Sequence, residues 1–350
     1  MKTLLFAAAL LSLSPVTIHL EQARAAHTGD WTLALNDRWS RNEERWLSLQ
    51  LQRSDDRRWG TSVRLADLEG LGQPPEDFTG DARFALKRDA GTIDFEGRFA
   101  DGRGHGTYRF SPSQPYIDDM RQMGFTLSDD DLFRVMALDV SRPFVRSIQD
   151  EGYRDTPLDD LVKMRIHGVD ADYIRAYRTH GYDRLPVADL VKTRIHGATP
   201  RFVQDLKSAG MAQLSVDQLV KMRIHGVTPE FIREIRDAGY KDLPVEQLVR
   251  LRIHGVTPAF IREIRGLGYT DLSLDDYVKM RIHGVTPAFI RELRELGYGD
   301  LPASRLVQFR IHGVTPEFVR EARAAGFKDL DAEELVDLSI HGRRWLTKRK

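Results

Sequence analysis

Residues 226–254 read GVTPEFIREIRDAGYKDLPVEQLVRLRIH, and stretches of nearly the same sequence fill the second half of the chain. The dipeptide His-Gly recurs every 29 residues, with its histidine at the end of one stretch and its glycine at the start of the next. Its histidines are His167, His196, His225, His254, His283, His312 and His341. A degenerate stretch from Val140 to Phe144 lies 29 residues before the segment that starts at Val169. A fixed period of this size is typical of stacked supersecondary units.

Each stretch predicts two short helices. In the first, Thr228 is the expected N-cap and Pro229 the first helical residue, where a missing N–H costs nothing. Phe231 and Ile235 then share one apolar face. Gly239 is the expected stop, because glycine adopts the left-handed conformation that ends many helices.

The second helix of each stretch is expected to start at a capping residue such as Ser215, with Gln218 completing a capping box. Its apolar stripe is expected to comprise Val216, Leu219, Val220 and Ile224. Gly226 ends it. Neither helix is long enough to be stable alone, so consecutive pairs must stack to bury both stripes. We therefore expect an α-solenoid of about seven αα-hairpins over residues 111–342.

Residues 26–110 predict a different kind of domain. Apolar residues alternate with polar ones, as in Trp31, Leu33 and Leu35, and this period of two is typical of half-buried strands. Turn signals at Asp89-Ala90-Gly91 and Ala100-Asp101-Gly102 separate such runs. We expect an antiparallel sheet or sandwich of about six strands. The fold class is therefore α+β.

The β domain offers two features that could suggest chemistry. Residues 102–106, Gly-Arg-Gly-His-Gly, resemble a nucleotide-binding glycine loop, but alternating residues follow instead of a helix, so a glycine-rich hairpin is favoured. Four tryptophans are expected to pack in the core rather than to form a ligand platform: Trp31, Trp39, Trp46 and Trp59. The spacing of Asp89, Asp94 and Glu96 picks out no acid/base pair.

Composition excludes several classes of protein. The 350 residues carry 52 Lys+Arg and 52 Asp+Glu, so the formal net charge is zero. A general nucleic-acid or acidic-membrane binder would usually have a one-signed field. The chain has no cysteine, which excludes disulfides, thiolate metal sites and a cysteine nucleophile. We expect no cofactor and no metal.

The two ends have their own patterns. Residues 1–25 predict a signal peptide, with a basic start, an apolar run and a cleavage site at Ala23-Arg24-Ala25. An uncleaved anchor or a buried helix is the alternative. No later segment is apolar enough to span a membrane, so we expect a periplasmic or secreted protein. Residues 343–350 form a basic tail.

The row of histidines raises the question of metal binding. Packed helices lie roughly 8–10 Å apart, too far for equivalent histidines to share one zinc ion. A histidine in the last turn of a helix can instead stabilise the negative helix end. We therefore expect a structural role for this row.

Two sets of arginines recur with the repeat. One lies two residues before the histidine, as Arg223 does, inside the expected apolar arc. It predicts either a structural ladder, with Asp242, Asp271, Asp300, Asp329 or backbone carbonyls as partners, or a groove for an anionic ligand. The other set lies on the exposed face of the first helix and gives the candidate partner-binding residues Arg233, Arg236, Arg262, Arg265, Arg291 and Arg294.

The segment from Leu219 to Ile235 also resembles a helix-hairpin-helix, a motif that grips DNA phosphates with backbone N–H groups. Thr228-Pro229 replaces its second glycine, and proline removes a donor. The sequence from His225 to Glu234 is similar to the 29-residue helical repeats of exported bacterial proteins. Similar repeats also follow the peptidase domain in membrane metallopeptidases of the β-lactam-sensor class. No His-Glu-x-x-His motif is present, so the peptidase activity does not follow from this resemblance. The resemblance implies a bacterial envelope protein with a sensing or interaction role.

We therefore expect a non-enzymatic exported scaffold that binds a protein or peptide in the cell envelope. Two alternatives stay open. One is nucleic-acid binding through the hairpin-like repeats, which the near-zero charge does not favour. The other is an enzyme with an unrecognised site in the β domain.

Overall fold

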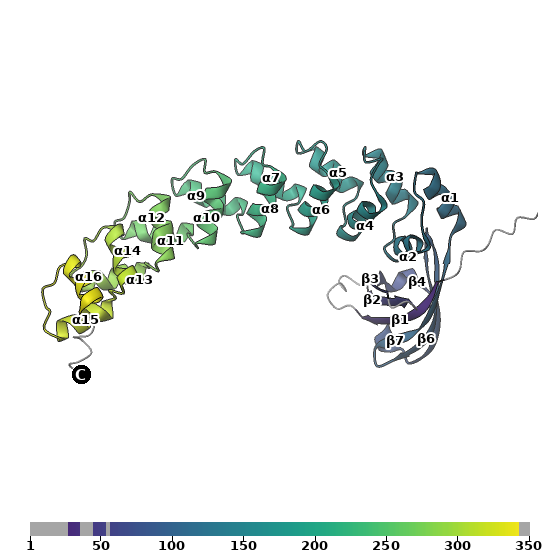
Figure 1. Ribbon diagram of the computed structural model, residues 1–350, viewed down its shortest axis with the longest axis horizontal. Helices are drawn as coiled ribbons and strands as arrows, with labels where there is room; N and C mark the ends of the chain where they lie inside the picture. Colours follow the sequence, from purple (N-terminus) through teal and green to yellow (C-terminus); the bar gives the residue numbers. More distant parts are fainter. Residues whose placement is uncertain (1–26, 36–44, 54–56, 343–350) are drawn as a thin grey trace, which may run out of the picture. The chain divides into compact units, whose positions relative to one another are not determined.

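The computed structural model describes residues 27–35, 45–53 and 57–342. The predicted signal peptide, the basic tail and Trp39 lie outside the described residues. The chain divides into two compact units, Met1–Gln149 and Asp150–Lys350. The first holds an antiparallel sheet with three helices, and the second holds the repeated helices (Figure 1). The α+β class predicted from the sequence is confirmed.

The first unit is built on one seven-stranded sheet rather than a sandwich. Its strands are β1 (His27–Leu35), β2 (Trp46–Arg53), β3 (Arg58–Arg64), β4 (Leu68–Glu69), β5 (Gly80–Arg88), β6 (Gly91–Ala100) and β7 (Arg103–Pro112). Two short 3-10 helices flank β4, η1 (Leu65–Asp67) and η2 (Pro75–Asp77). The strand order is β3-β2-β1-β7-β6-β5-β4, and every neighbouring pair is antiparallel.

The predicted hairpins form with the predicted turns. Arg88 pairs with Gly91, which leaves Asp89 and Ala90 as a two-residue loop. In the next hairpin Asp101 and Gly102 both have positive φ, 50° and 75°, as a type I′ turn requires. The glycine-rich segment after it belongs to strand β7, so it is a hairpin strand and not a nucleotide-binding loop.

One face of the sheet carries the core of the first unit. Trp31 is 1% exposed, donates from Nε1 to the carbonyl of Thr107 at 3.0 Å and meets the ring of Phe84 edge-on. Phe133, from helix α2 (Asp129–Ala137), packs against Trp59 with ring centroids 4.8 Å apart. The alternation in the strands therefore marks the buried face correctly.

Two further helices complete this unit, α1 (Gln114–Gln122) and α3 (Arg142–Asp150). Arg142, at the start of α3, holds Asp89 in the first hairpin turn through two guanidinium nitrogens and its backbone N–H, at 2.5–3.0 Å. It also donates to Asp119 of α1 at 2.8 Å. The carboxyl of Asp89 is thus an anchor for these helices.

The second unit consists of short helices, nearly all eight to ten residues long, arranged in a row (Figure 1). The first helices of the pairs are α5 (Ala171–Arg178), α7 (Pro200–Ser208), α9 (Pro229–Asp237), α11 (Pro258–Gly266), α13 (Pro287–Glu295) and α15 (Pro316–Ala324). The second helices are α4 (Leu158–His167), α6 (Val187–Ile195), α8 (Val216–Ile224), α10 (Val245–Ile253), α12 (Leu274–Ile282), α14 (Ala303–His312) and α16 (Ala332–His341).

The ends of these helices follow the local sequence rules. The hydroxyl of Thr228 accepts the N–H of Phe231 at 3.2 Å, and Ser215 forms its capping box with Gln218. At the other end of α8, Gly226 has φ +67°, and the next N–H, that of Val227, bonds the carbonyl of Met222. This arrangement is a Schellman motif, and it sends Val227 back into the core.

Equivalent helices of successive pairs pack against each other. Each second helix contacts the next second helix from α4 to α16, and each first helix contacts the next first helix from α5 to α15. Phe231, Ile235, Leu248 and Val256 are among the side chains that fill the space between the two rows. The predicted continuous interior of stacked pairs is therefore present.

Candidate functional site

Basic side chains near the end of each first helix are occupied by the fold. Each reaches back one repeat and donates to a backbone carbonyl close to the end of the preceding first helix, where the helix dipole attracts a cation. The bonds join Arg178 to Glu151, Lys207 to His180, Arg236 to Ala209, Arg265 to Ala238, Arg294 to Leu267 and Arg323 to Leu296. The expectation of an open solvated face is wrong for Arg236 and Arg265, which are half-buried.

The other three candidate arginines do lie in solvent. Arg233, Arg262 and Arg291 are exposed on the outer face of the first helices. Arg233 pairs with Glu230 of its own helix at 2.8 Å. Each arginine is followed by a glutamate in the sequence, so this face carries charges of both signs. An exposed face of mixed charge has little preference for a partner of one sign.

The seven histidines lie at the ends of the second helices, as their spacing predicts. They are half-buried or exposed. Two of their backbone carbonyls, those of His167 and His283, accept N–H groups from arginines of the next repeat. Within the described part of the chain, no group of three His, Cys, Asp or Glu residues lies close enough to hold a metal ion.

The arginine before the histidine links the second helix to the first helix of its own repeat in five repeats. Its guanidinium lies over the aromatic ring at the start of the preceding first helix, with Cζ 4.7–5.1 Å from the ring centre. The stacked pairs are Arg194 on Tyr173, Arg223 on Phe202, Arg252 on Phe231, Arg281 on Phe260 and Arg310 on Phe289. In the last repeat Ser339 stands in place of the arginine, and its hydroxyl donates to the carbonyl of His312.

The structure therefore corrects the partners expected for this row. Arg194 and Arg310 donate from Nε to the carbonyls of His167 and His283 at 3.2 and 3.3 Å. In the described residues no ion pair joins the five stacked arginines to Asp242, Asp271, Asp300 or Asp329. The expected carbonyl bond is therefore present for Arg194 and Arg310, and it leaves the positive charge of each guanidinium unbalanced.

A row of exposed isoleucines is the feature that the sequence pattern did not reveal. The residue between each arginine and histidine was expected in the apolar stripe, yet its exposed fraction is between 48% and 58% in every repeat. The row comprises Ile166, Ile195, Ile224, Ile253, Ile282, Ile311 and Ile340. Phe327 is the only other large apolar side chain of the described residues that is exposed to a comparable degree.

The Schellman motif explains this exposure. After Gly226 the chain reverses, and Val227, which is 0% exposed, closes the end of the core that Ile224 would otherwise fill. Ile224 is left in the last turn, pointing away from the buried stripe. Isoleucine nevertheless occupies this place in all seven repeats, with histidine after it in all seven and arginine before it in six. That invariance within one chain was the signal available from the sequence.

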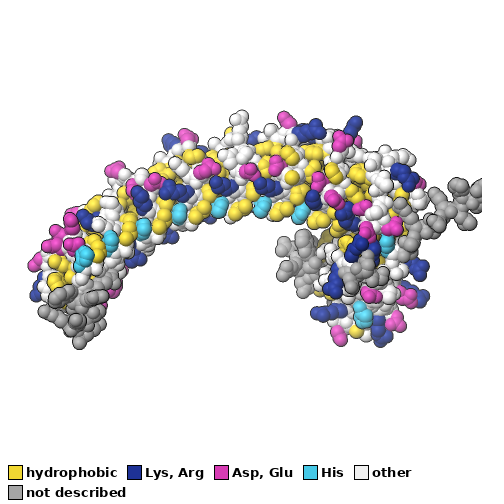
Figure 2. All heavy atoms as spheres, viewed as in Figure 1, with side chains coloured by type: hydrophobic (Ala, Val, Ile, Leu, Met, Phe, Trp, Pro, Cys, Tyr) yellow, Lys and Arg dark blue, Asp and Glu magenta, His cyan; other side chains and the backbone are white. Residues whose placement is uncertain are grey.

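We name these side chains together the RIH strip: the seven isoleucines, the arginines stacked beside them and the seven histidines. Figure 2 shows the histidines as a line along the repeat array, with basic side chains beside them. Exposed apolar side chains in a continuous line mark an interaction surface more often than a solvated one. The strip is the candidate functional site of the second unit.

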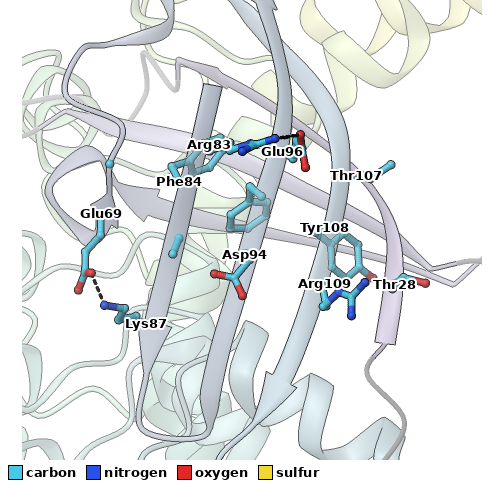
Figure 3. Close-up of a pocket in the computed structure, with 13 residues that line it drawn as sticks. Thr28, Glu69, Arg83, Phe84, Lys87, Asp94, Glu96, Thr107, Tyr108 and Arg109 are labelled. Carbon is cyan, nitrogen blue, oxygen red and sulfur yellow. Dashed lines mark hydrogen bonds and ion pairs between the residues drawn. The ribbon is translucent and has the colours of Figure 1, made fainter. Parts of the chain in front are cut away.

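The first unit has a separate hollow of about 930 Å³ on the polar face of the sheet (Figure 3). Four of its charged groups are paired: Arg83 with Glu96 at 2.7 Å and Lys87 with Glu69 at 2.5 Å. Hydrogen bonds to these glutamates raise the pKa of both basic groups. Mutual pairing leaves no poised acid or base among these four exposed side chains. Asp94 and Arg109 also line the hollow.

Comparisons with protein-family models, with curated proteins and with solved structures give no match in any of the three. Fold and site together define a class: an α+β protein with a helical-repeat array that carries one exposed apolar and basic line. None of the described helices is both long and apolar enough to cross a bilayer.

Proposed function

We propose that this chain is a non-enzymatic exported repeat protein and that its helical array binds a protein or peptide partner along the RIH strip. The observation that carries the proposal is the invariant isoleucine, more than half exposed in six of the seven repeats and 48% exposed in the last. Such a side chain costs solubility and adds nothing to the core, so its retention fits a contact made with another molecule.

The helix-pair architecture supports the same proposal. Stacked repeats present a long surface on which one recognition element recurs at a constant interval. Export and residence in the bacterial envelope rest on the signal-like N-terminal segment and on the resemblance of the repeat wording to envelope proteins.

The nucleic-acid alternative finds less support. The turn between α8 and α9 would have to offer free N–H groups to a phosphate. The hydroxyl of Thr228 already accepts the N–H of Phe231, and Pro229 has none to give. An enzyme in the β domain finds little support in the hollow of Figure 3, where Arg83 and Lys87 pair with the two glutamates.

Affinity capture with two matched variants of the full chain tests the proposal. One triple variant removes strip isoleucines: Ile224→Ser, Ile253→Ser and Ile282→Ser. The other removes the arginines on the outer face of the first helices: Arg233→Gln, Arg262→Gln and Arg291→Gln. All six side chains are exposed, so both variants should fold.

We expect extract of the producing cells to yield proteins that bind the wild-type chain and the arginine variant but not the isoleucine variant. Circular dichroism checks that each variant is folded. Equal capture by the isoleucine variant and the wild type would show that the strip is not the binding surface. Loss of capture only in the arginine variant would show that the partner binds the outer face of the first helices, as the sequence predicts.

A further inference from the structure

The charges around the RIH strip are not balanced within the protein. Two residues before three of the stacked arginines lies another basic residue, and an acidic residue of the next repeat neutralises it in these successive repeats. The pairs are Lys192 with Asp217, Lys221 with Glu246 and Arg250 with Asp275. By contrast, Arg194, Arg223, Arg252, Arg281 and Arg310 have no carboxylate partner in the part of the chain that the structure describes.

Each stacked arginine is therefore fixed in place but keeps its charge toward solvent. Its contacts are a ring face and, for Arg194 and Arg310, a backbone carbonyl, and neither cancels a unit charge. Beside every such charge stands an isoleucine that is more than half exposed. The complementary ligand carries carboxylates next to aliphatic side chains.

The interval of the repeats restricts the form of that ligand. Successive second helices pack together, and packed helices lie roughly 8–10 Å apart. An extended chain advances about 3.3 Å per residue, so about three residues pass each repeat. A polyproline II segment, with three residues per turn and about 9 Å per turn, has the same interval. A peptide with a period of three places equivalent side chains on successive repeats.

The composition of the strip favours a peptide over a lipid surface or a nucleic acid. Its large apolar members are all isoleucine. Proteins that lie at a membrane interface usually anchor with Trp and Tyr, and single-stranded nucleic acids stack on exposed aromatic rings. The rings beside the strip, such as Phe231 and Phe260, are buried under the arginines.

We infer that the RIH strip binds an extended acidic peptide segment in which a carboxylate and an aliphatic side chain recur about every three residues. The inference rests on the proposed function and names the chemistry of its partner. Arginines hold the carboxylates, and the isoleucines cover the aliphatic groups.

Fluorescence anisotropy of labelled synthetic peptides on the full chain tests the inference. The probe is an 18-residue peptide of repeated Asp-Val-Ser. One control replaces Asp by Asn, and a second replaces Val by Ser. We expect the probe to bind about ten-fold or more tightly than either control, and to weaken as salt rises from about 50 to about 500 mM. The Ile224→Ser, Ile253→Ser, Ile282→Ser variant should lose the same ten-fold or more.

Three results would overturn the inference: equal binding of the Asp and Asn peptides, unchanged binding to the isoleucine variant, or binding to phosphatidylglycerol vesicles without binding to the Asp peptide. Its failure is distinguishable from failure of the proposed function. If extract proteins still depend on the strip isoleucines while the Asp peptide does not bind, the strip is a docking surface for a partner of other chemistry. If capture is also independent of the isoleucines, both proposals fail.

Discussion

A ladder of tyrosine hydroxyls links helix pairs of successive repeats at five places, and removing part of it should weaken the whole array. At these places the tyrosine that follows the first helix donates to a leucine carbonyl 32 residues later, just before the next repeat's second helix. The bonds run from Tyr153 to Leu185, Tyr182 to Leu214, Tyr240 to Leu272, Tyr269 to Leu301 and Tyr298 to Leu330, at 2.6–2.8 Å. We call these five bonds the tyrosine ladder.

The perturbation is the triple change Tyr240→Phe, Tyr269→Phe and Tyr298→Phe. Phenylalanine keeps the ring in place, so the loss is confined to three hydrogen bonds. Each bond contributes about 1 kcal/mol net to the free energy of unfolding. Its loss costs more where the leucine carbonyl that loses its donor stays inaccessible to water. The three sites lie in successive repeats and share no partner, so their effects should add to about 3 kcal/mol. For a unit of this size, that lowers the melting temperature by about 6–12 °C.

Thermal and urea unfolding followed by circular dichroism at 222 nm measure the change. Hydrogen exchange locates it, because a repeat array can open in parts, and protection should fall most across residues 229–330. Tyr277→Phe is the matched control. Its hydroxyl is buried and has no hydrogen-bond partner in the described part of the chain, so its removal should change stability by less than about 0.5 kcal/mol. If the triple variant melts within 2 °C of the wild type, the ladder does not stabilise the array.

Three further outcomes are expected. Met211 occupies the place of a ladder tyrosine. In the Met211→Tyr variant the new hydroxyl should bond the carbonyl of Leu243 and raise the free energy of unfolding, measured by urea titration, by about 1 kcal/mol. No gain would mean that the carbonyl is out of reach of the hydroxyl. Burial raises the pKa of Tyr277 to about 12 because it disfavours the ionised form in the folded state. The free energy of unfolding is therefore unaffected by this group below the ordinary tyrosine pKa of about 10 and falls as pH rises toward 12; absorbance at 295 nm and circular dichroism should change together, and unchanged ellipticity to pH 12 would contradict this. Burial acts to raise the pKa of Asp89, but hydrogen bonds from Arg142 outweigh burial and lower this pKa. The stability that the ionised Asp89 provides is therefore present above about pH 4 and is lost as pH falls further. Asp89→Asn should lower the free energy of unfolding by about 2 kcal/mol at neutral pH and make it depend less on pH in the acid range.

The sequence predicts the local geometry of the repeats well because that geometry is encoded within a few residues. The cap at Thr228, the capping box at Ser215 and the stop at Gly226 each depend on neighbours in the chain, and all three form as expected. The turn at Asp101 succeeds for the same reason, since its conformation is set by the residues that occupy it.

Contacts between repeats were harder to predict because their acceptors have no side-chain signature. Tyr240 bonds a backbone carbonyl, and so does Arg236, whereas the sequence pattern suggests aspartates as partners for arginines such as Arg223. Ile224 was misplaced because a helical wheel assumes that the core extends to the last turn. Val227, beyond the glycine, fills that space instead. About six strands were expected and the sheet has seven; β4 has only two residues, too few to show an alternation.

The hydrogen bonds from the ladder tyrosines and from the arginines near the ends of the first helices span a constant 32 and 27 residues, so these bonds do not depend on the ordinal position of a helix pair. Excising residues 255–283 would bring Arg294 against the carbonyl of Ala238, Arg310 against the carbonyl of His254, and Leu301 under the hydroxyl of Tyr240, each replacing a group of the same kind. A gene for this protein can therefore gain or lose blocks of about 87 nucleotides by recombination and still encode an array in which these hydrogen bonds form. A deletion that is not a multiple of this block leaves a junction at which donors and acceptors do not match.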